Sequence, residues 1–120
     1  MAQRPVLTPT SAHPITITET GHHVTVRIGG VPVAETDDAL TLQESTYPPV
    51  HYLPLADVRA DVLTRSDTTT YCPYKGDAAY YHVGDVQDAV WTYEEPFPAV
   101  AAIAGRVAFY PDKADIDVGP

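Results

Sequence analysis

Apolar and polar residues alternate through the first half of the chain. Residues 15–18 and 24–28 carry apolar side chains at every second position, which is typical of strands with one buried face. Gly29-Gly30 fits a two-residue hairpin turn, because such a turn needs positive φ angles that glycine accepts. The turn predicts a register in which Ile28 faces Val31, Val26 faces Val33 and Val24 faces Glu35.

The predicted register places Glu35 on the apolar face of its strand. The next strand pattern, Leu40–Glu44, repeats this feature, because Glu44 lines up with Leu40 and Leu42. A carboxylate on an apolar face either pairs with a cation or has its pKa raised by burial. A paired carboxylate can position a ligand, and one with a raised pKa can act as an acid or base. Each glutamate could instead lie at a strand end and reach water or a structural arginine.

The pattern changes after Pro54. Apolar residues at positions 55, 58, 62 and 63 have helical spacing, and Pro54 and Asp57 suit a first helical turn. We therefore predict one short helix near 55–64. Alternating patterns return at 78–83, 89–94 and 106–110 and around Ile116. The predicted fold class is mainly β, a small α+β domain.

The ends of the chain and its linkers suggest one folded unit. Residues 1–14 are rich in Pro, Thr and Ser and lack apolar periodicity, which predicts a flexible N-terminal arm. No internal repeat or second linker follows, so residues 15–120 are expected to form a single β-rich domain.

The composition restricts the classes of molecule that the chain is expected to bind. The chain has 120 residues with 16 acidic and 7 basic side chains, a formal net charge of −9, which argues against nucleic acid and anionic lipid surfaces. Without an apolar signal segment or a membrane-length apolar run, we expect a cytoplasmic protein. One cysteine excludes an intramolecular disulfide and a thiolate zinc site, and the five histidines lack ligand spacing. We therefore expect no metal and no cofactor.

Residues 70–80 hold the strongest local motif, Thr-Tyr-Cys-Pro-Tyr-Lys-Gly-Asp-Ala-Ala-Tyr. Pro73 and Gly76 suit a sharp turn beside Lys75, one of only two lysines in the chain. Lys75 could hold a carboxylate or stabilise an oxyanion, or the turn could matter for its shape alone. Cys72 could act as a nucleophile if a base lowered its pKa, or it could be a small buried apolar side chain.

Aromatic side chains alternate on two further strand patterns, at Trp91 and Tyr93 and at Tyr80. Large rings on adjacent strands usually form core, but tyrosine hydroxyls need partners when buried and often converge in ligand pockets. His51 could line such a pocket together with Glu44 and Lys75. The candidate ligand-binding residues are Glu35, Tyr52, Tyr80, Trp91 and Tyr93.

The motif at 70–80 resembles the Thr-x-Cys-Pro-x-Lys-Gly-x-Ala-x-Tyr signature of a small bacterial family, domain of unknown function 427. The resemblance extends over nearly all of 20–118. It implies a single domain of bent antiparallel sheets resembling the β-tent fold of methionine-sulfoxide reductase B. Many relatives of that fold bind zinc through paired cysteines, which this chain lacks. Flanking residues that agree with the family in order include Ala34-Glu35, Tyr52-Leu53-Pro54, Trp91-Thr92-Tyr93 and Val107-Ala108-Phe109-Tyr110.

The same family has also been labelled nucleotidyltransferase-like. Such enzymes pair a Gly-Ser turn with an Asp-x-Asp motif to hold magnesium and a nucleoside triphosphate. Here the only Asp-x-Asp is Asp115-Ile116-Asp117, and no Gly-Ser precedes it. We therefore do not expect nucleotidyl transfer.

Two hypotheses for function follow. In the first, the chain binds a small organic molecule in an aromatic pocket and acts on it by acid–base chemistry of lyase, cyclase, isomerase or hydrolase type. Glu44 would transfer protons and Lys75 would steady negative charge, with Cys72 as a third candidate catalytic residue. In the second, the chain is a non-catalytic module for a small ligand or a protein. Convergence of Glu44 and Lys75 within about 6–8 Å on a shared cavity favours the first. Homodimer formation stays open.

Overall fold

The computed structural model describes residues 4–119, which form ten β-strands in two antiparallel sheets. This confirms the predicted mainly β fold class. The larger sheet has, in spatial order, β1 (Ile15–Glu19), β4 (Leu40–Glu44), β5 (Val50–Pro54), β9 (Arg106–Phe109), β8 (Val86–Thr92), β7 (Gly76–Val83) and β6 (Leu63–Cys72). The smaller sheet has β10 (Asp115–Val118), β2 (Val24–Ile28) and β3 (Val31–Thr36).

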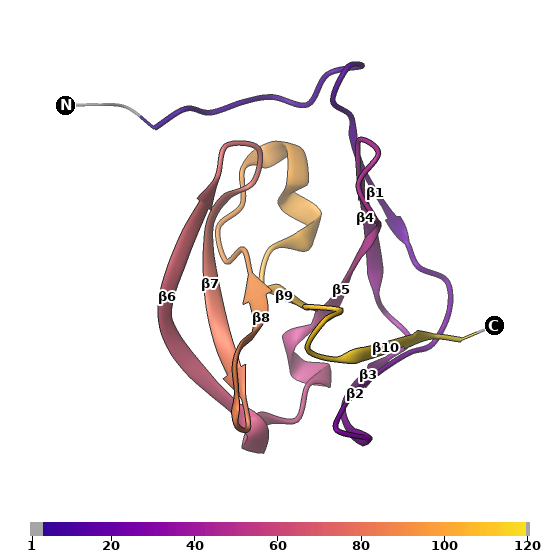
Figure 1. Cartoon of the computed structure of the whole chain (residues 1–120). Coiled ribbons are helices and arrows are strands. Elements are labelled where there is room, and N and C mark those ends of the chain that lie inside the picture. Colours follow the sequence, from indigo (N-terminus) through magenta and orange to yellow (C-terminus); the bar gives the residue numbers. More distant parts are fainter. Residues whose placement is uncertain (1–3, 120) are drawn as a thin grey trace.

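The larger sheet is bent into two wings that face each other (Figure 1). One wing holds β6, β7 and β8, and the other holds β1, β4 and β5. Strand β9 joins them, and its pairing with β5 is short, Leu53 with Val107 and Pro54 with Arg106. Segment η3 (Pro98–Ile103), a 3₁₀ helix, lies at one end of the space between the wings (Figure 1). This bend creates the concave side on which a site can form.

Two clusters of buried side chains lie on opposite faces of the bend. Because successive side chains of a strand point to opposite faces, β5 and β9 divide between them. Leu53 and Val107 belong to the cluster that packs against the smaller sheet. Tyr52 and Ala108 belong to the cluster between the wings. The second cluster comprises Leu42, Tyr52, Ala78, Tyr80, Tyr93, Val100, Ile103 and Ala108.

The β2–β3 hairpin departs from the predicted register. It begins with Ile28 opposite Val31, as predicted, but a β-bulge beside Val26 then shifts the pairing by one residue. Glu35 consequently pairs with Thr25, and its side chain is 63% exposed. The prediction that Glu35 lies on the apolar face is therefore wrong. A shift of one residue moves every later side chain to the other face of a strand.

The helix predicted near 55–64 takes a different form. The segment contains two single 3₁₀ turns, η1 (Leu55–Asp57) and η2 (Ala60–Val62), followed directly by β6. Between the turns, Val58 is extended, with φ −99° and ψ 139°, and it forms an isolated bridge with Ala34 of β3. Val58 is buried by this contact. Packing against β3 therefore outweighs the helical spacing of the segment.

The N-terminal arm lies from residue 4 along the β6–β7 turn. The Tyr71 hydroxyl donates a hydrogen bond to the Pro5 carbonyl at 2.7 Å, and the Leu7 amide donates to the Pro73 carbonyl at 2.9 Å. The flexibility of the arm stays a prediction. In the described part of the chain, helical segments are 3₁₀ turns, and none has the length and apolar character needed to span a bilayer.

Candidate functional site

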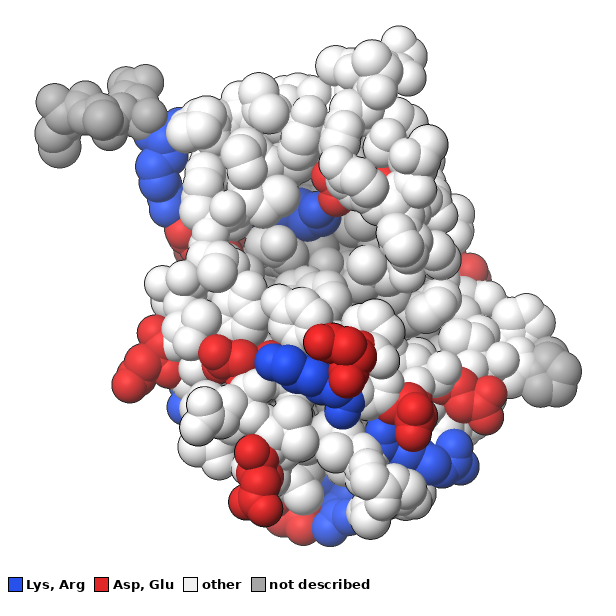
Figure 2. Space-filling model, in the orientation of Figure 1, with Lys and Arg blue, Asp and Glu red and all other residues white. Residues whose placement is uncertain are grey.

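A cavity of about 220 Å³ lies between the two wings. In Figure 2, blue and red atoms meet inside a hollow whose walls are otherwise white. Strands β4 and β5 form one wall of the cavity, and β7, β8 and the segments after β8 and β9 form the other. The lining residues are Leu42, Glu44, Tyr47, Pro48, Val50, Tyr52, Lys75, Tyr80, Trp91, Tyr93 and Tyr110.

The structure brings most of the candidate residues from the sequence together at this cavity. Cys72 does not line it, but its sulfur accepts a hydrogen bond from Lys75 Nζ at 3.8 Å. Glu35 lies on the smaller sheet, away from the cavity, and His51 lines a neighbouring groove instead. The candidates that line the cavity are Glu44, Tyr52, Lys75, Tyr80, Trp91 and Tyr93.

Glu44 is the centre of the polar contacts. It is the last residue of β4, and its side chain accepts a hydrogen bond at Oε1 from Lys75 Nζ, at 2.5 Å. At Oε2 it accepts one from His13 Nε2, at 2.8 Å. The Lys75 and Glu44 side chains are only 10% and 15% exposed. The pair thus connects the two wings and is largely shielded from solvent.

His13 comes from the N-terminal arm and was not a candidate from the sequence. Its ring stacks on Tyr74, with centroids 4.3 Å apart and planes inclined by 12°. The arm is anchored beside it, because the Ser45 amide donates to the Pro14 carbonyl at 2.8 Å. No sequence pattern indicates this contact, since His13 and Glu44 meet only through the path of the arm.

Electrostatics keep Glu44 ionised. Burial by itself raises the pKa of this carboxyl group, but hydrogen bonds and attraction from Lys75 and His13 outweigh burial and lower the pKa below its ordinary value. Of the two states considered from the sequence, Glu44 therefore adopts the paired one. At neutral pH it is a carboxylate that can accept protons and hydrogen bonds.

This lowered pKa predicts acid sensitivity. The ordinary pKa of the group is 4.5, and a folded-state pKa below it gives stability that is present above that pH and lost as pH falls through the folded value. Urea unfolding of the protein and of Glu44→Gln between pH 3 and 7 should show a difference that is constant above about pH 5.5 and shrinks below about pH 4.5. A difference that does not change with pH would contradict the assignment.

The turn that places Lys75 at the cavity needs a residue at position 76 that accepts a positive φ angle, which is Gly76. This residue has φ +109°, and a Cβ there would lie 3.5 Å from the Glu95 carbonyl oxygen. The Phe97 amide donates to the Lys75 carbonyl at 2.9 Å, which ties the turn to the segment after β8.

Gly76→Ala is expected to lower the free energy of unfolding by about 1–3 kcal/mol, because residues with a Cβ avoid this backbone region. Gly84, at φ +55° with open space around it, is the matched control. Gly84→Ala should cost about 1 kcal/mol. Equal losses for the two variants in urea unfolding would show that the turn at Gly76 is not specially constrained.

Two buried tyrosines at the cavity have hydroxyl protons that nothing in the described chain accepts. Tyr52 accepts a hydrogen bond from Trp91 Nε1 at 3.2 Å, which leaves its own O–H free to donate. Tyr93 is 8% exposed, and its hydroxyl has no hydrogen-bond partner among residues 4–119. Burial raises the pKa of both phenols well above the ordinary value. Both are therefore neutral donors at physiological pH.

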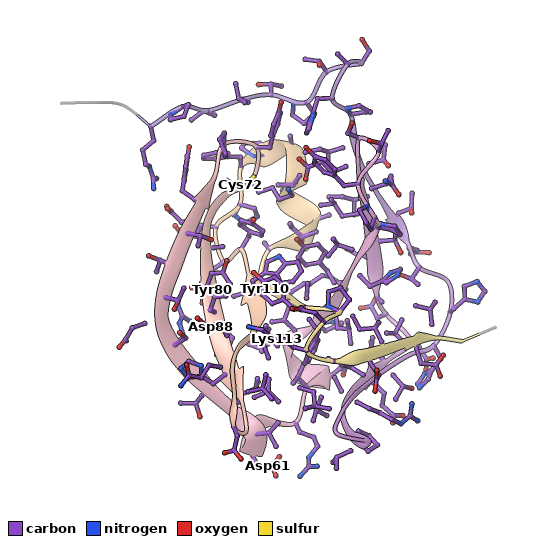
Figure 3. The ribbon with its side chains drawn as sticks, viewed as in Figure 1. Asp61, Cys72, Tyr80, Asp88, Tyr110 and Lys113 are labelled. Atoms are coloured by element: carbon purple, nitrogen blue, oxygen red, sulfur yellow. The ribbon has the colours of Figure 1, made fainter. Side chains whose placement is uncertain are left out.

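Two other tyrosines of the wall, Tyr80 and Tyr110, already have hydrogen-bond partners. The Tyr80 hydroxyl shares a hydrogen bond with Thr70 Oγ1 at 2.9 Å and accepts one from Tyr110 at 3.4 Å. The Tyr80 and Tyr110 side chains lie near each other between the wings (Figure 3). Tyr110 was missed as a site residue, although it continues the alternating pattern at 106–110. These two rings supply shape rather than free donors.

Two further hollows lie near the site. A depression of about 500 Å³ lies beside Arg65, Asp77 and Glu94, but its charges already pair, Arg65 with Glu94 at 2.8 Å and Asp77 with Arg4. An apolar groove of about 460 Å³ adjoins the cavity, and both are lined by Tyr47, Pro48, Val50 and Trp91. Within residues 4–119, no three His, Cys, Asp or Glu side chains are grouped so that they could hold a metal ion.

Comparison with known proteins now identifies the family. A family model described as Domain of unknown function (DUF427) matches residues 16–119. A comparison with curated proteins finds no match. The matched range includes Glu44, Lys75 and the aromatic wall, and it begins after His13. The resemblance carried by the motif at 70–80 is thereby confirmed, and the chain belongs to the DUF427 family.

Proposed function

We propose that this protein binds a small organic molecule in the cavity between the wings and acts on it, in the cytoplasm, by acid–base chemistry. The observation that carries the proposal is the Glu44–Lys75 pair, which lies at a cavity otherwise walled by aromatic and aliphatic side chains. Ligand sites commonly combine such a wall with a few convergent polar groups. An ionised carboxylate beside a lysine is equipped to take a proton and to stabilise the charge that results.

The cavity size limits the ligand. Its volume of about 220 Å³ is below the roughly 300–1,000 Å³ of pockets for drug-sized molecules. It exceeds the roughly 150 Å³ of an apolar cavity that accepts benzene. One ring with a short substituent fits the cavity itself, and the adjoining groove leaves room for a longer group.

Each polar group has a role in the proposed chemistry. Glu44 accepts a proton from the ligand, and the electron pair of the broken bond stays on the ligand. Lys75 has three N–H donors, of which one contacts Glu44 and one contacts Cys72. The third N–H can donate to the negative charge on the ligand. Cys72, outside the cavity lining, is assigned to the support of Lys75 rather than to nucleophilic attack.

The proposal is tested by incubating the protein with a panel of single-ring metabolites in deuterium oxide and following each by proton NMR. We expect at least one compound to be converted or to exchange a carbon-bound proton for deuterium, since returning a proton from Glu44 would deliver solvent deuterium. If compounds bind at the cavity but none exchanges or changes, the acid–base proposal is wrong.

A non-catalytic binding module is the second candidate. It is favoured by one observation, that both oxygens of Glu44 already accept hydrogen bonds and its pKa is lowered, which makes it a weaker proton acceptor. This candidate predicts saturable binding of the same ligands without deuterium exchange.

A further inference from the structure

We infer that the cavity is built to bind a carbonyl oxygen and to stabilise the enolate that forms when Glu44 removes the neighbouring proton, with Tyr52, Tyr93 and Lys75 as donors. The inference rests on the proposed function and names its substrate class. The C–H bond next to the carbonyl breaks and its proton passes to the Glu44 carboxylate. The electron pair forms a C=C bond, and the carbonyl oxygen becomes an oxyanion that accepts hydrogen bonds.

The Tyr93 hydroxyl is a free hydrogen-bond donor in the wall of the cavity. Its side chain is buried to more than nine-tenths, lines the cavity, and has no hydrogen-bond partner among the described residues. The hydroxyl oxygen itself keeps some solvent access, because it is not among the fully enclosed side-chain atoms that lack a partner. A molecule that fills the cavity can accept its proton. The hydroxyl therefore points to a ligand atom that accepts a hydrogen bond.

Tyr52 and Lys75 add donors from both walls. The Tyr52 oxygen is occupied by Trp91 Nε1, so the free function of that hydroxyl is donation. Lys75 retains one N–H after its contacts with Glu44 and Cys72. The site thus offers three hydrogen-bond donors, Tyr52, Tyr93 and Lys75, and one acceptor, the Glu44 carboxylate. A ligand oxygen with two lone pairs matches this set better than an amine or another donor.

The charge of the site favours a neutral carbonyl over an anionic group. Lys75 and Glu44 cancel each other, and no arginine lines the cavity in the described chain. A phosphate would face the Glu44 carboxylate with only one cation to offset it. A neutral carbonyl meets no such repulsion and acquires charge only as the proton leaves, where fixed donors are most effective.

The ionisation of the phenols agrees with this role. Burial, followed by the nearby Tyr52, Cys72, Tyr80 and Glu44, raises the pKa of Tyr93. Burial likewise raises the pKa of Tyr52. Each phenol therefore keeps its proton over the physiological range and can donate it in a hydrogen bond throughout.

The test uses 4-nitrophenolate, a single-ring oxyanion that resembles an enolate and changes its visible absorption on binding. Titration of Glu44→Gln, whose neutral side chain resembles Glu44 after it has taken up the proton, should show binding at a pH at which the free compound is ionised. Added to Glu44→Gln, Tyr93→Phe and Tyr52→Phe should each weaken it by about 10–100-fold, because a hydrogen bond to a charged group is lost. Tyr81→Phe, whose hydroxyl faces Arg65 outside the cavity, is the matched control and should bind normally.

Stability separates this role from a structural one. If the Tyr93 hydroxyl serves the ligand alone, Tyr93→Phe should unfold in urea at the same or a higher concentration than the unaltered protein. Unchanged 4-nitrophenolate binding when Tyr93→Phe is added to Glu44→Gln, or no binding by Glu44→Gln, would overturn the inference and leave proton transfer by Glu44 standing. Deuterium exchange that survives Glu44→Gln, with phenolate binding intact, would overturn proton transfer by Glu44, and with it the proposed function, but would leave Tyr52, Tyr93 and Lys75 as the donors to the oxyanion.

Discussion

Glu44→Gln is expected to slow deuterium exchange or turnover of the substrate by about 10²–10⁴-fold, the usual contribution of a general base. Glutamine keeps the length of the side chain and can still accept a hydrogen bond from Lys75, so the walls of the cavity should stay in place. It cannot take up a proton from the ligand. Rates from NMR under saturating substrate would show the loss in kcat rather than in KM.

Two further variants sharpen this prediction. Glu35→Gln changes an equivalent carboxylate that is 63% exposed on the smaller sheet, and it should leave the rate unchanged. Glu44→Asp restores a carboxylate but withdraws it by one methylene, so it should recover part of the activity. A normal rate in Glu44→Gln, or equal losses in Glu35→Gln and Glu44→Gln, would remove Glu44 from the mechanism.

Lys75→Met is expected to lower the free energy of unfolding by about 2–4 kcal/mol. Removing one partner of a buried ion pair leaves the other charge without its counterion, which typically costs about 3–5 kcal/mol. We expect a somewhat smaller loss because 15% of the Glu44 side chain is exposed and His13 still donates to it. Urea unfolding at neutral pH measures the difference.

The chain supplies its own control for this prediction. Lys113, the other lysine, is exposed and donates to the Gln87 carbonyl at 3.0 Å, so Lys113→Met should cost less than about 1 kcal/mol. Adding Glu44→Gln to Lys75→Met should recover stability, because the stranded carboxylate is removed. A double variant that loses the sum of the two single losses would show that the two residues do not stabilise each other.

The sequence was informative where strand alternation is undisturbed. In β4 no bulge intervenes, so the prediction that Glu44 lies on the same face as Leu42 agrees with the structure, where both line the cavity. In β3 the same reasoning misplaced Glu35, because the bulge beside Val26 adds one residue. Pro32, which cannot donate to the ladder, lies next to this irregularity and was the available signal.

Contacts between distant segments could not be predicted. The helical spacing at 55–63 reflects real apolar positions, but Val58 is used to bridge β3 and so cannot continue a helix. The meeting of His13, Glu44 and Lys75 depends on the bend of the larger sheet and on the path of the arm. Neither the bend nor the path of the arm gives a periodic pattern in the sequence, because both are set by packing between residues far apart along the chain.

The division of the buried side chains into two clusters has an evolutionary consequence. Tyr52, Tyr80 and Tyr93 belong to the cluster between the wings and also wall the cavity, whereas no member of the other cluster lines it. Substitutions that adapt the cavity to a new ligand therefore disturb only one half of the interior. The other half can hold the fold while such substitutions accumulate.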